Sequence, residues 1–351
     1  MIGIEKSLLN LRELDRELIQ DDFIQKVSYE VQDNIILYNQ RFQKSFFVDY
    51  APQVFERLRQ ISKIKKSHFL QSMGNSHLIY KLIKGEFSSF QESISQGKSG
   101  SLFYFSNDRQ FILKTIQRRE YLVLKRMLKN YYYHILNNKN SMIIRLFGLY
   151  KIKYVKINNY QEKKIYFTVF NNLFNTSLKI SVIYDLKGAH YKRKVDPNDF
   201  SKARKEVNFE EDRVQLDLDY QSRKQLMTQI QSDVNFLQQQ QLMDYSLLVG
   251  IHEVNPQKQF KASRRSLNHH IFTSEGKDKL YFMSIIDIFT EYNLVKKLET
   301  FSKQIVSKFN DISSIPPKDY GARFEEYIHK RVLKKKYRSF PDRQFDQNLS
   351  L

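Results

Sequence analysis

Three ionisable residues stand inside apolar stretches of this chain, where a charge is costly unless it meets a partner. Lys114 lies within residues 111–116, Asp244 within 242–248, and Asp287 directly after two isoleucines. A strand lysine can pair with nucleotide phosphates, while one acid accepts the proton of a hydroxyl and another holds Mg²⁺. The three residues therefore fit phosphoryl transfer, although single acids at strand ends often serve only as caps or turn residues.

A glycine-rich turn, residues 97–101, precedes Lys114 and contains Gly97, Gly100 and Ser101. Glycines allow close approach of a ligand, and exposed backbone N–H groups can cradle phosphates. The turn does not have the GxxxxGK[ST] pattern of a P-loop, and a simple hairpin loop is the alternative. Glu120, in the next predicted helix, is a candidate partner for Lys114, as in protein kinases. The HRDxxxxN and DFG motifs are absent, which excludes an ordinary protein kinase.

Apolar periodicity predicts the elements that position these residues. It predicts helices over 5–45, from about Pro52, and over 117–136, 219–241 and 319–334, and strands at 102–105, 111–116, 146–155, 164–170, 243–252 and 280–288. The order indicates a small α+β lobe that ends near residue 172. We therefore predict an N-terminal helical extension over 1–45, a first lobe over 46–172, a second lobe over 173–335, and a basic tail over 336–351.

Composition narrows the classes of function. The 351 residues include 58 Lys and Arg against 38 Asp and Glu, a net charge of +20, which favours a polyanionic partner such as nucleic acid, an anionic membrane or a phosphorylated substrate. The absence of cysteine excludes disulfides, cysteine-ligated zinc and a thiol nucleophile. No run approaches the ~18 apolar residues of a spanning helix, and the first residues lack an apolar signal-peptide core. We expect a chain that is neither secreted nor embedded in a membrane.

The motifs, taken in order, resemble those of the phosphatidylinositol phosphate kinases, a family of lipid kinases. The matching stretches are 49–55, 97–101, 111–116, 147–150, 169–172, 184–188, 243–248 and 285–287. Tyr-Asp-Leu-Lys-Gly at 184–188 and Met-Asp-Tyr-Ser-Leu-Leu at 243–248 are specific to the family. The resemblance covers roughly 46–329 and implies an α+β, two-lobed lipid-kinase fold distantly related to protein kinases, with antiparallel sheets and flanking helices.

The resemblance also implies roles for individual residues. Lys114 and Lys187 look like the two lysines that contact ATP phosphates. Asp244 looks like the catalytic aspartate, and Asp287 looks like the acid that holds Mg²⁺. The segment 169–172, which includes Asn171 and Asn172, resembles the hinge beside adenine. ATP and Mg²⁺ are the implied cofactors.

Residues 288–319 correspond to the activation loop, which in this family selects the lipid and contacts the membrane. Lys296 and Lys297 resemble its dibasic pair, and Leu298-Glu299 resembles the type I form. The implied activity is a 1-phosphatidylinositol-4-phosphate 5-kinase that produces phosphatidylinositol 4,5-bisphosphate. The implied setting is the cytosolic face of the plasma membrane, where the protein binds peripherally to anionic lipid, without nucleic acid and with a homodimer as a possible form.

Three departures from the family pattern stand out: Ser284 replaces a usual Gly, Ala189-His190 replaces a usual Ser-Thr, and Phe170 replaces a common Met. None removes a charged catalytic group. Two alternatives within the resemblance stay open, a type II-like 4-kinase that acts on phosphatidylinositol 5-phosphate and a catalytically weak phosphoinositide-binding scaffold. A basic nucleic-acid-binding protein is suggested by charge alone, and no nucleic-acid motif supports it.

Overall fold

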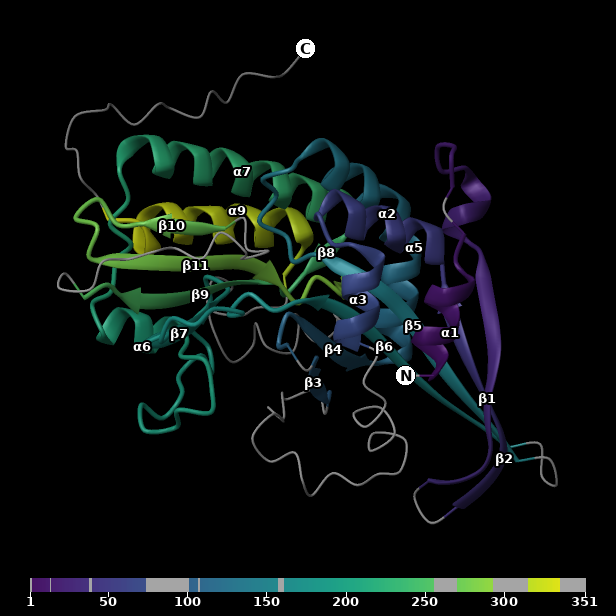
Figure 1. Cartoon of the computed structure of the whole chain (residues 1–351). Coiled ribbons are helices and arrows are strands. Elements are labelled where there is room, and N and C mark those ends of the chain that lie inside the picture. Colours follow the sequence, from purple (N-terminus) through teal and green to yellow (C-terminus); the bar gives the residue numbers. More distant parts are fainter. Residues whose placement is uncertain are drawn as a thin grey trace.

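The computed structural model describes residues 2–12, 14–37, 40–73, 101–106, 108–156, 161–255, 270–292 and 315–334. Two antiparallel sheets lie beside each other with helices packed along them (Figure 1). This α+β arrangement of antiparallel sheets with flanking helices confirms the predicted fold class.

The first sheet has six strands in the order β1-β2-β5-β6-β4-β3. Their bounds are Lys26–Leu37 (β1), Gln40–Tyr50 (β2), Leu146–Lys156 (β5), Gln161–Asn171 (β6), Phe111–Ile116 (β4) and Phe103–Phe105 (β3). Strand β4 carries Lys114 and pairs with β3 on one side and β6 on the other, which confirms the predicted hairpin of 102–105 with 111–116.

The second sheet has four strands in the order β10-β11-β9-β7, and a two-stranded sheet joins β12 to β8. Their bounds are Ile271–Thr273 (β10), Lys279–Ile286 (β11), Ser246–Glu253 (β9), Val182–Leu186 (β7), Thr290–Glu291 (β12) and Leu242–Met243 (β8). Strand β11 confirms the strand predicted over 280–288.

The helices pack along the sheets. They are α1 (Ile2–Asn10), η1 (Gln20–Phe23), α2 (Pro52–Ile61), α3 (Lys66–Met73), α5 (Arg118–Asn137), α6 (Glu206–Glu211), α7 (Tyr220–Gln239), α9 (Pro317–Tyr327) and the π-helical turn η4 (Ile328–Val332). One continuous core joins α2, α5, α7 and α9 to both sheets. A second cluster lies between the six-stranded sheet and helices α1 and α3. No helix in the described ranges combines the length and apolarity needed to cross a membrane.

Helix α5 shows why the periodic helices were predictable. Its buried positions include Tyr121, Leu124, Leu128 and Tyr131, which recur at steps of three and four and so share one face. The same spacing identified α7, while Pro52 correctly marked the first turn of α2, where a missing N–H costs nothing.

The helix predicted over residues 5–45 is wrong. In the described part of this range, Ile2–Asn10 forms an α-helix and Gln20–Phe23 a single 3₁₀ turn, while Lys26–Leu37 and Gln40–Tyr50 form a hairpin that extends the six-stranded sheet. Strand β2 pairs with β5, about a hundred residues further along the chain, so its side chains gain their partners only through tertiary pairing. The predicted boundary at 45/46 falls inside β2.

Candidate active site

Three strand ends meet at one edge of the four-stranded sheet. The last residue of β7 pairs with the second residue of β9, and the last residue of β11 pairs with the first residue of β9. Because both pairings are antiparallel, the chain leaves β7, enters β9 and leaves β11 at the same edge. Lys187 follows β7, Asp244 lies two residues before β9, and Asp287 follows β11.

Both acids adopt the left-handed backbone conformation, with φ of 63° at Asp244 and 60° at Asp287. This conformation is uncommon for residues other than glycine and is often found at functional sites. Each acid stands at a corner between two strands, Asp244 between β8 and β9 and Asp287 between β11 and β12. Because β12 pairs with β8, these two corners lie side by side. The carboxylates of Asp244 and Asp287 are therefore close to each other.

Two lysine–aspartate ion pairs form at this edge. Nζ of Lys187 lies 2.8 Å from Oδ1 of Asp244 and also donates a 2.7 Å hydrogen bond to the main-chain oxygen of Asp244. Nζ of Lys114, from the six-stranded sheet, lies 2.8 Å from Oδ1 of Asp287. The structure therefore brings together the four charged residues that the sequence singled out, from both sheets.

The Lys114–Asp287 pair is buried on one side and open on the other. Lys114 is only 6% exposed, and the rings of Phe103 and Phe289 have their centroids 5.4 and 5.9 Å from its Nζ. The side chain of Asp287 is 45% exposed. An incoming anion or cation can thus reach the pair from the side of the acid.

Attraction to opposite charges in the cluster keeps Asp287 and Lys187 charged. Burial alone would raise the pKa of Asp287, but the ammonium groups of Lys114 and Lys187 outweigh it and lower that pKa. Burial would likewise lower the pKa of Lys187, but Asp244, Asp185 and Asp287 raise it instead. Both groups are therefore ionised at neutral pH.

A buried acid holds the turn that carries Lys187. Glu206, on α6, is 0% exposed; its Oε1 accepts the backbone N–H groups of Lys187 and, at 3.0 Å, of Gly188. Its Oε2 accepts a 2.6 Å hydrogen bond from Nε of Arg193, whose guanidinium also binds Asp185. Gly188 has a φ of +72°, which suits glycine and lets the chain reverse directly after the lysine.

Sequence reasoning missed Glu206 and Arg193. Both lie in the charged stretch that follows β7. In such a stretch, the sequence does not distinguish a buried ion pair from a solvent-exposed one. The pairing of Arg193 with Glu206 becomes evident only in the fold, which places α6 against the turn that carries Lys187. An isolated sequence carries no signal that separates Glu206 from its exposed neighbours.

The predicted pairing of Lys114 with Glu120 is not formed. Glu120 stands in the first turn of α5, where its carboxylate accepts a 2.6 Å hydrogen bond from the backbone N–H of Gln117 and so caps the helix. A residue in the first turn is engaged by the orphan N–H groups of the helix end, and the acid that meets Lys114 is Asp287.

The two hinge asparagines are buried and bonded to the backbone. Oδ1 of Asn171 accepts the N–H of Arg145 at 2.9 Å. Nδ2 of Asn172 donates to the carbonyl of Arg109 at 2.8 Å, and its Oδ1 accepts the N–H of Phe174. Their side chains shape the segment after β6, and a direct role of Asn171 or Asn172 in nucleotide binding stays a prediction.

Several predicted residues lie outside the described part of the chain. They are Gly97 and Gly100 of the glycine-rich turn, and Lys296, Lys297 and Glu299 of the activation loop. Ser101, the described end of that turn, is buried at 4% exposure just before β3.

The departures from the family pattern are accommodated. Ser284 is buried in β11, and its hydroxyl donates a 2.9 Å hydrogen bond to the carbonyl of Met142. Ala189 is fully buried behind the Lys187 turn. Neither residue displaces one of the four charged groups.

The donor set suits a magnesium ion that is shared with a nucleotide. Among the described residues, no three or more acidic or histidine side chains cluster as a complete metal cage. Mg²⁺ is usually held by one or two carboxylates together with substrate phosphates and water, and does not need such a cage. The half-exposed carboxylate of Asp287, with the ammonium groups of Lys114 and Lys187 nearby, fits this arrangement.

Comparison with known proteins bears on this site. A family model described as phosphatidylinositol-4-phosphate 5-kinase matches residues 85–272 and 256–331. The chain is 32% identical, over 95% of its length, to the phosphatidylinositol 4-phosphate 5-kinase of Plasmodium falciparum. It is 27% identical over 91% to the 5-kinase its3 of Schizosaccharomyces pombe, and 28% identical over 95% to the human type-1 beta 5-kinase. The chain spans 21%, 50% and 67% of the lengths of these three relatives.

Proposed function

The chain belongs to the phosphatidylinositol-4-phosphate 5-kinase family, and we propose that it transfers the γ-phosphate of ATP to the inositol ring of a phosphatidylinositol monophosphate. The observation that carries the proposal is the meeting of two lysines and two aspartates at one sheet edge, in two ion pairs of 2.8 Å. Phosphoryl transfer is catalysed mainly by positioning and by charge stabilisation, which such a cluster supplies.

Each side chain has a part in the proposed reaction. Lys114 and Lys187 offset the charge of the ATP phosphates. Asp244 orients the inositol hydroxyl and takes its proton while the hydroxyl oxygen forms a bond to the γ-phosphorus. The bond from that phosphorus to the β-phosphate oxygen breaks, and ADP leaves. Asp287 would hold Mg²⁺, which when bound neutralises phosphate charge.

We propose phosphatidylinositol 4-phosphate as the substrate. The relatives whose names support this choice are called phosphatidylinositol 4-phosphate 5-kinases. The resemblance of Leu298-Glu299 to the type I form supports it too, although these residues lie outside the described ranges. Phosphatidylinositol 5-phosphate is the substrate of the alternative, a type II-like 4-kinase.

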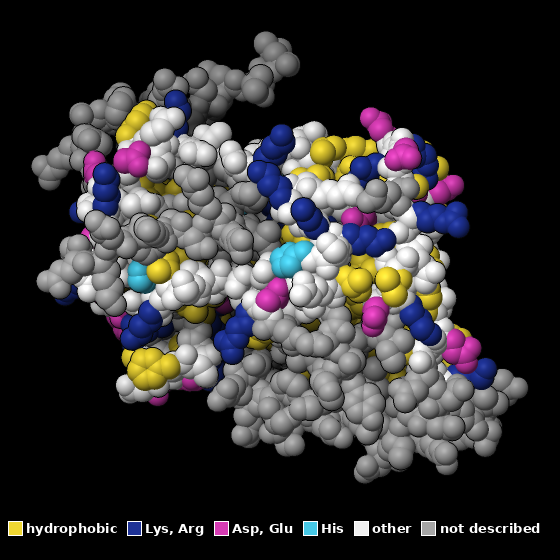
Figure 2. All heavy atoms as spheres, viewed as in Figure 1, with side chains coloured by type: hydrophobic (Ala, Val, Ile, Leu, Met, Phe, Trp, Pro, Cys, Tyr) yellow, Lys and Arg dark blue, Asp and Glu magenta, His cyan; other side chains and the backbone are white. Residues whose placement is uncertain are grey.

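We propose peripheral binding to an anionic membrane. Figure 2 shows Lys and Arg side chains distributed over the described part of one face. The pKa of Lys151 is lowered, first by burial and then by repulsion from nearby lysines, namely Lys164, Lys26, Lys153 and Lys125. A like-charged cluster gains when anionic headgroups approach, by about 1 kcal/mol per Lys or Arg. The cytosolic face of the plasma membrane and a homodimer stay predictions.

The proposal is tested with labelled ATP, Mg²⁺ and vesicles that each carry one of the three phosphatidylinositol monophosphates. We expect label to enter the 4-phosphate lipid, and the Asp287→Asn protein to lose this activity. Label mainly in the 5-phosphate lipid would keep the kinase and overturn the substrate. Binding to all vesicles without any transfer would favour the scaffold.

A further inference from the structure

One fully buried carboxylate lies outside the cluster described above. Asp233, on α7, has a side chain that is 0% exposed. Its Oδ1 lies 2.7 Å from Nε2 of His134 and accepts a 3.0 Å hydrogen bond from Gln229, while its Oδ2 accepts the N–H of Met142 at 2.6 Å. A carboxylate removed from water is costly unless hydrogen bonds replace its hydration, and Asp233 receives three. Because His134 lies on α5 and Met142 lies between α5 and β5, Asp233 is a junction between these elements and α7.

One arm of the junction is the segment 141–145, here called the strap, which leads from α5 into β5. The carbonyl of Met142 accepts the N–H of Ile285 at 2.7 Å and the hydroxyl of Ser284 at 2.9 Å. The N–H of Ile144 donates to the carbonyl of Ile285 at 2.9 Å. The strap therefore pairs with the end of β11, where Ile143 is the partner of Ile285, two residues before Asp287.

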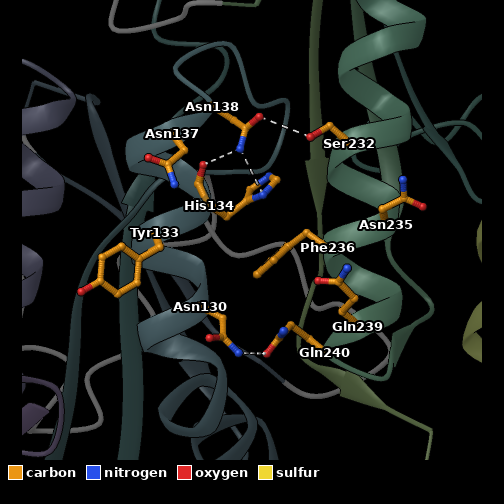
Figure 3. A pocket seen from close by; sticks show the side chains of 10 residues that line it. All are labelled: Asn130, Tyr133, His134, Asn137, Asn138, Ser232, Asn235, Phe236, Gln239 and Gln240. Atoms are coloured by element: carbon orange, nitrogen blue, oxygen red, sulfur yellow. Dashed lines mark hydrogen bonds between the residues drawn. The ribbon is translucent and has the colours of Figure 1, made fainter.

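The other arm of the junction is α5. His134 lies on this helix, which begins four residues after Lys114. Figure 3 shows His134 facing α7, where Phe236 stacks on it with ring centroids 4.4 Å apart. Hydrogen bonds from Asn130 to Gln240 and from Ser232 to Asn138 also cross the groove of about 490 Å³ between the two helices. Helices α5 and α7 are thus tied at their surface and again at Asp233.

We infer that Asp233 is a positioning residue that sets the separation between Lys114 and Asp287, an inference that rests on the proposed function of that pair. Asp233 binds the helix that follows the lysine's strand and the strap that pairs with the aspartate's strand. Loss of its carboxylate frees the strap N–H of Met142 and the ring of His134 together. The end of β11 then loses its fixed place relative to β4, without any change to a group that touches ATP.

Asp22 provides a matched control. It is also a buried carboxylate, 6% exposed, and it also receives one backbone N–H, from Ile19, and side-chain donors, from Arg16. It lies in η1, away from the strap. Asp233→Ala and Asp22→Ala therefore remove the same kind of group, and differ in whether the strap is affected.

The first readout is the affinity for ATP with and without Mg²⁺, measured without lipid. Residues that orient a metal ligand typically contribute 10–100-fold to metal binding or activity. We expect Asp233→Ala to reduce the gain in ATP affinity from Mg²⁺ by about tenfold or more, and Asp22→Ala to leave that gain unchanged. Asp233→Asn, which keeps one oxygen for Met142, should fall between them, and Ser284→Gly should reduce the gain by ~5-fold, the worth of one hydrogen bond.

The second readout is hydrogen–deuterium exchange of peptides that contain Ile144 and Ile285, which needs no nucleotide. Faster exchange in Asp233→Ala or, if that protein does not fold, in Asp233→Asn, but not in Asp22→Ala, is the expected result. Equal exchange in the Asp233 and Asp22 variants would overturn the inference, as would an unchanged Mg²⁺ gain in a folded Asp233 variant. If the unaltered protein binds no ATP, the proposed function fails, and the exchange experiment still decides whether Asp233 holds the strap.

Discussion

Lys114 and Asp287 are 173 positions apart in the chain, yet Nζ of the lysine lies 2.8 Å from Oδ1 of the aspartate. Each residue thus neutralises the charge of the other. A nucleotide phosphate would replace the aspartate as the partner of Lys114, and a cation would replace the lysine as the partner of Asp287. Phosphate and cation binding are therefore expected to favour each other, because each frees the residue that the other needs.

The two members of this pair should contribute unequally to stability. Asp287→Asn leaves the ammonium of Lys114, which is 6% exposed, without its acid, and should lower the free energy of unfolding by about 1–3 kcal/mol. Lys114→Met leaves a carboxylate that water reaches, and should cost less than about 1 kcal/mol. Urea unfolding of both variants measures the difference. A Lys114→Met protein as unstable as Asp287→Asn would contradict the assigned burial.

Glu206 should matter for activity although it touches no substrate. Glu206→Gln removes one of the oxygens that hold the Lys187–Gly188 turn and Arg193, so we expect transfer to fall by about tenfold. Glu210→Gln, on the same helix, removes only an exposed contact with His190 and should change transfer by less than about twofold. Steady-state transfer rates compare the two, and equal effects would argue against a role for the buried acid.

Asp49 should impose a pH dependence on stability. Burial raises the pKa of this carboxyl to about 7, and the hydroxyl of Ser7 is 2.6 Å from its Oδ2. The folded protein then binds a proton that the unfolded chain has released above pH ~4, so the free energy of unfolding falls as pH rises from about 4 to 7. Asp49→Asn should flatten this part of the curve, as measured by urea unfolding at several pH values. An unchanged slope would show that Asp49 is ionised when folded.

Charge reversal in the lysine cluster should weaken membrane binding. Lys151→Glu changes the local charge by two units, and should reduce binding to anionic vesicles by about tenfold or more at low salt. The difference should shrink at high salt, because the charges are screened. Lys330→Glu is the control. It makes the same change of charge on another element, η4, where Lys330 pairs with Glu326. Vesicle sedimentation with anionic and neutral lipid tests this, and equal loss in both variants would assign binding to net charge alone.

The sequence revealed the charged centre better than it revealed the frame around it. Lys114, Asp244 and Asp287 were recognisable because each is a lone charge in an apolar run, a pattern that local sequence displays. Glu206 was not, since nothing near it in sequence indicates that it is buried. Asp233 shares the buried face of α7 with Ile230 and Leu237, but its partners His134 and Met142 lie far away in the sequence. Residues 26–45 were wrongly predicted as helix because their strand pairing depends on β5, which lies far along the chain.

The most direct test of the account is the effect of Asp244→Asn on transfer and on ATP binding. The variant keeps the size of the side chain and removes the carboxylate that we propose takes the proton of the hydroxyl, a role worth about 10²–10⁴ in rate. We predict that single-turnover transfer to phosphatidylinositol 4-phosphate falls by at least about a hundredfold, while ATP still binds. Transfer at an undiminished rate would contradict the assignment of Asp244 and the mechanism built on it.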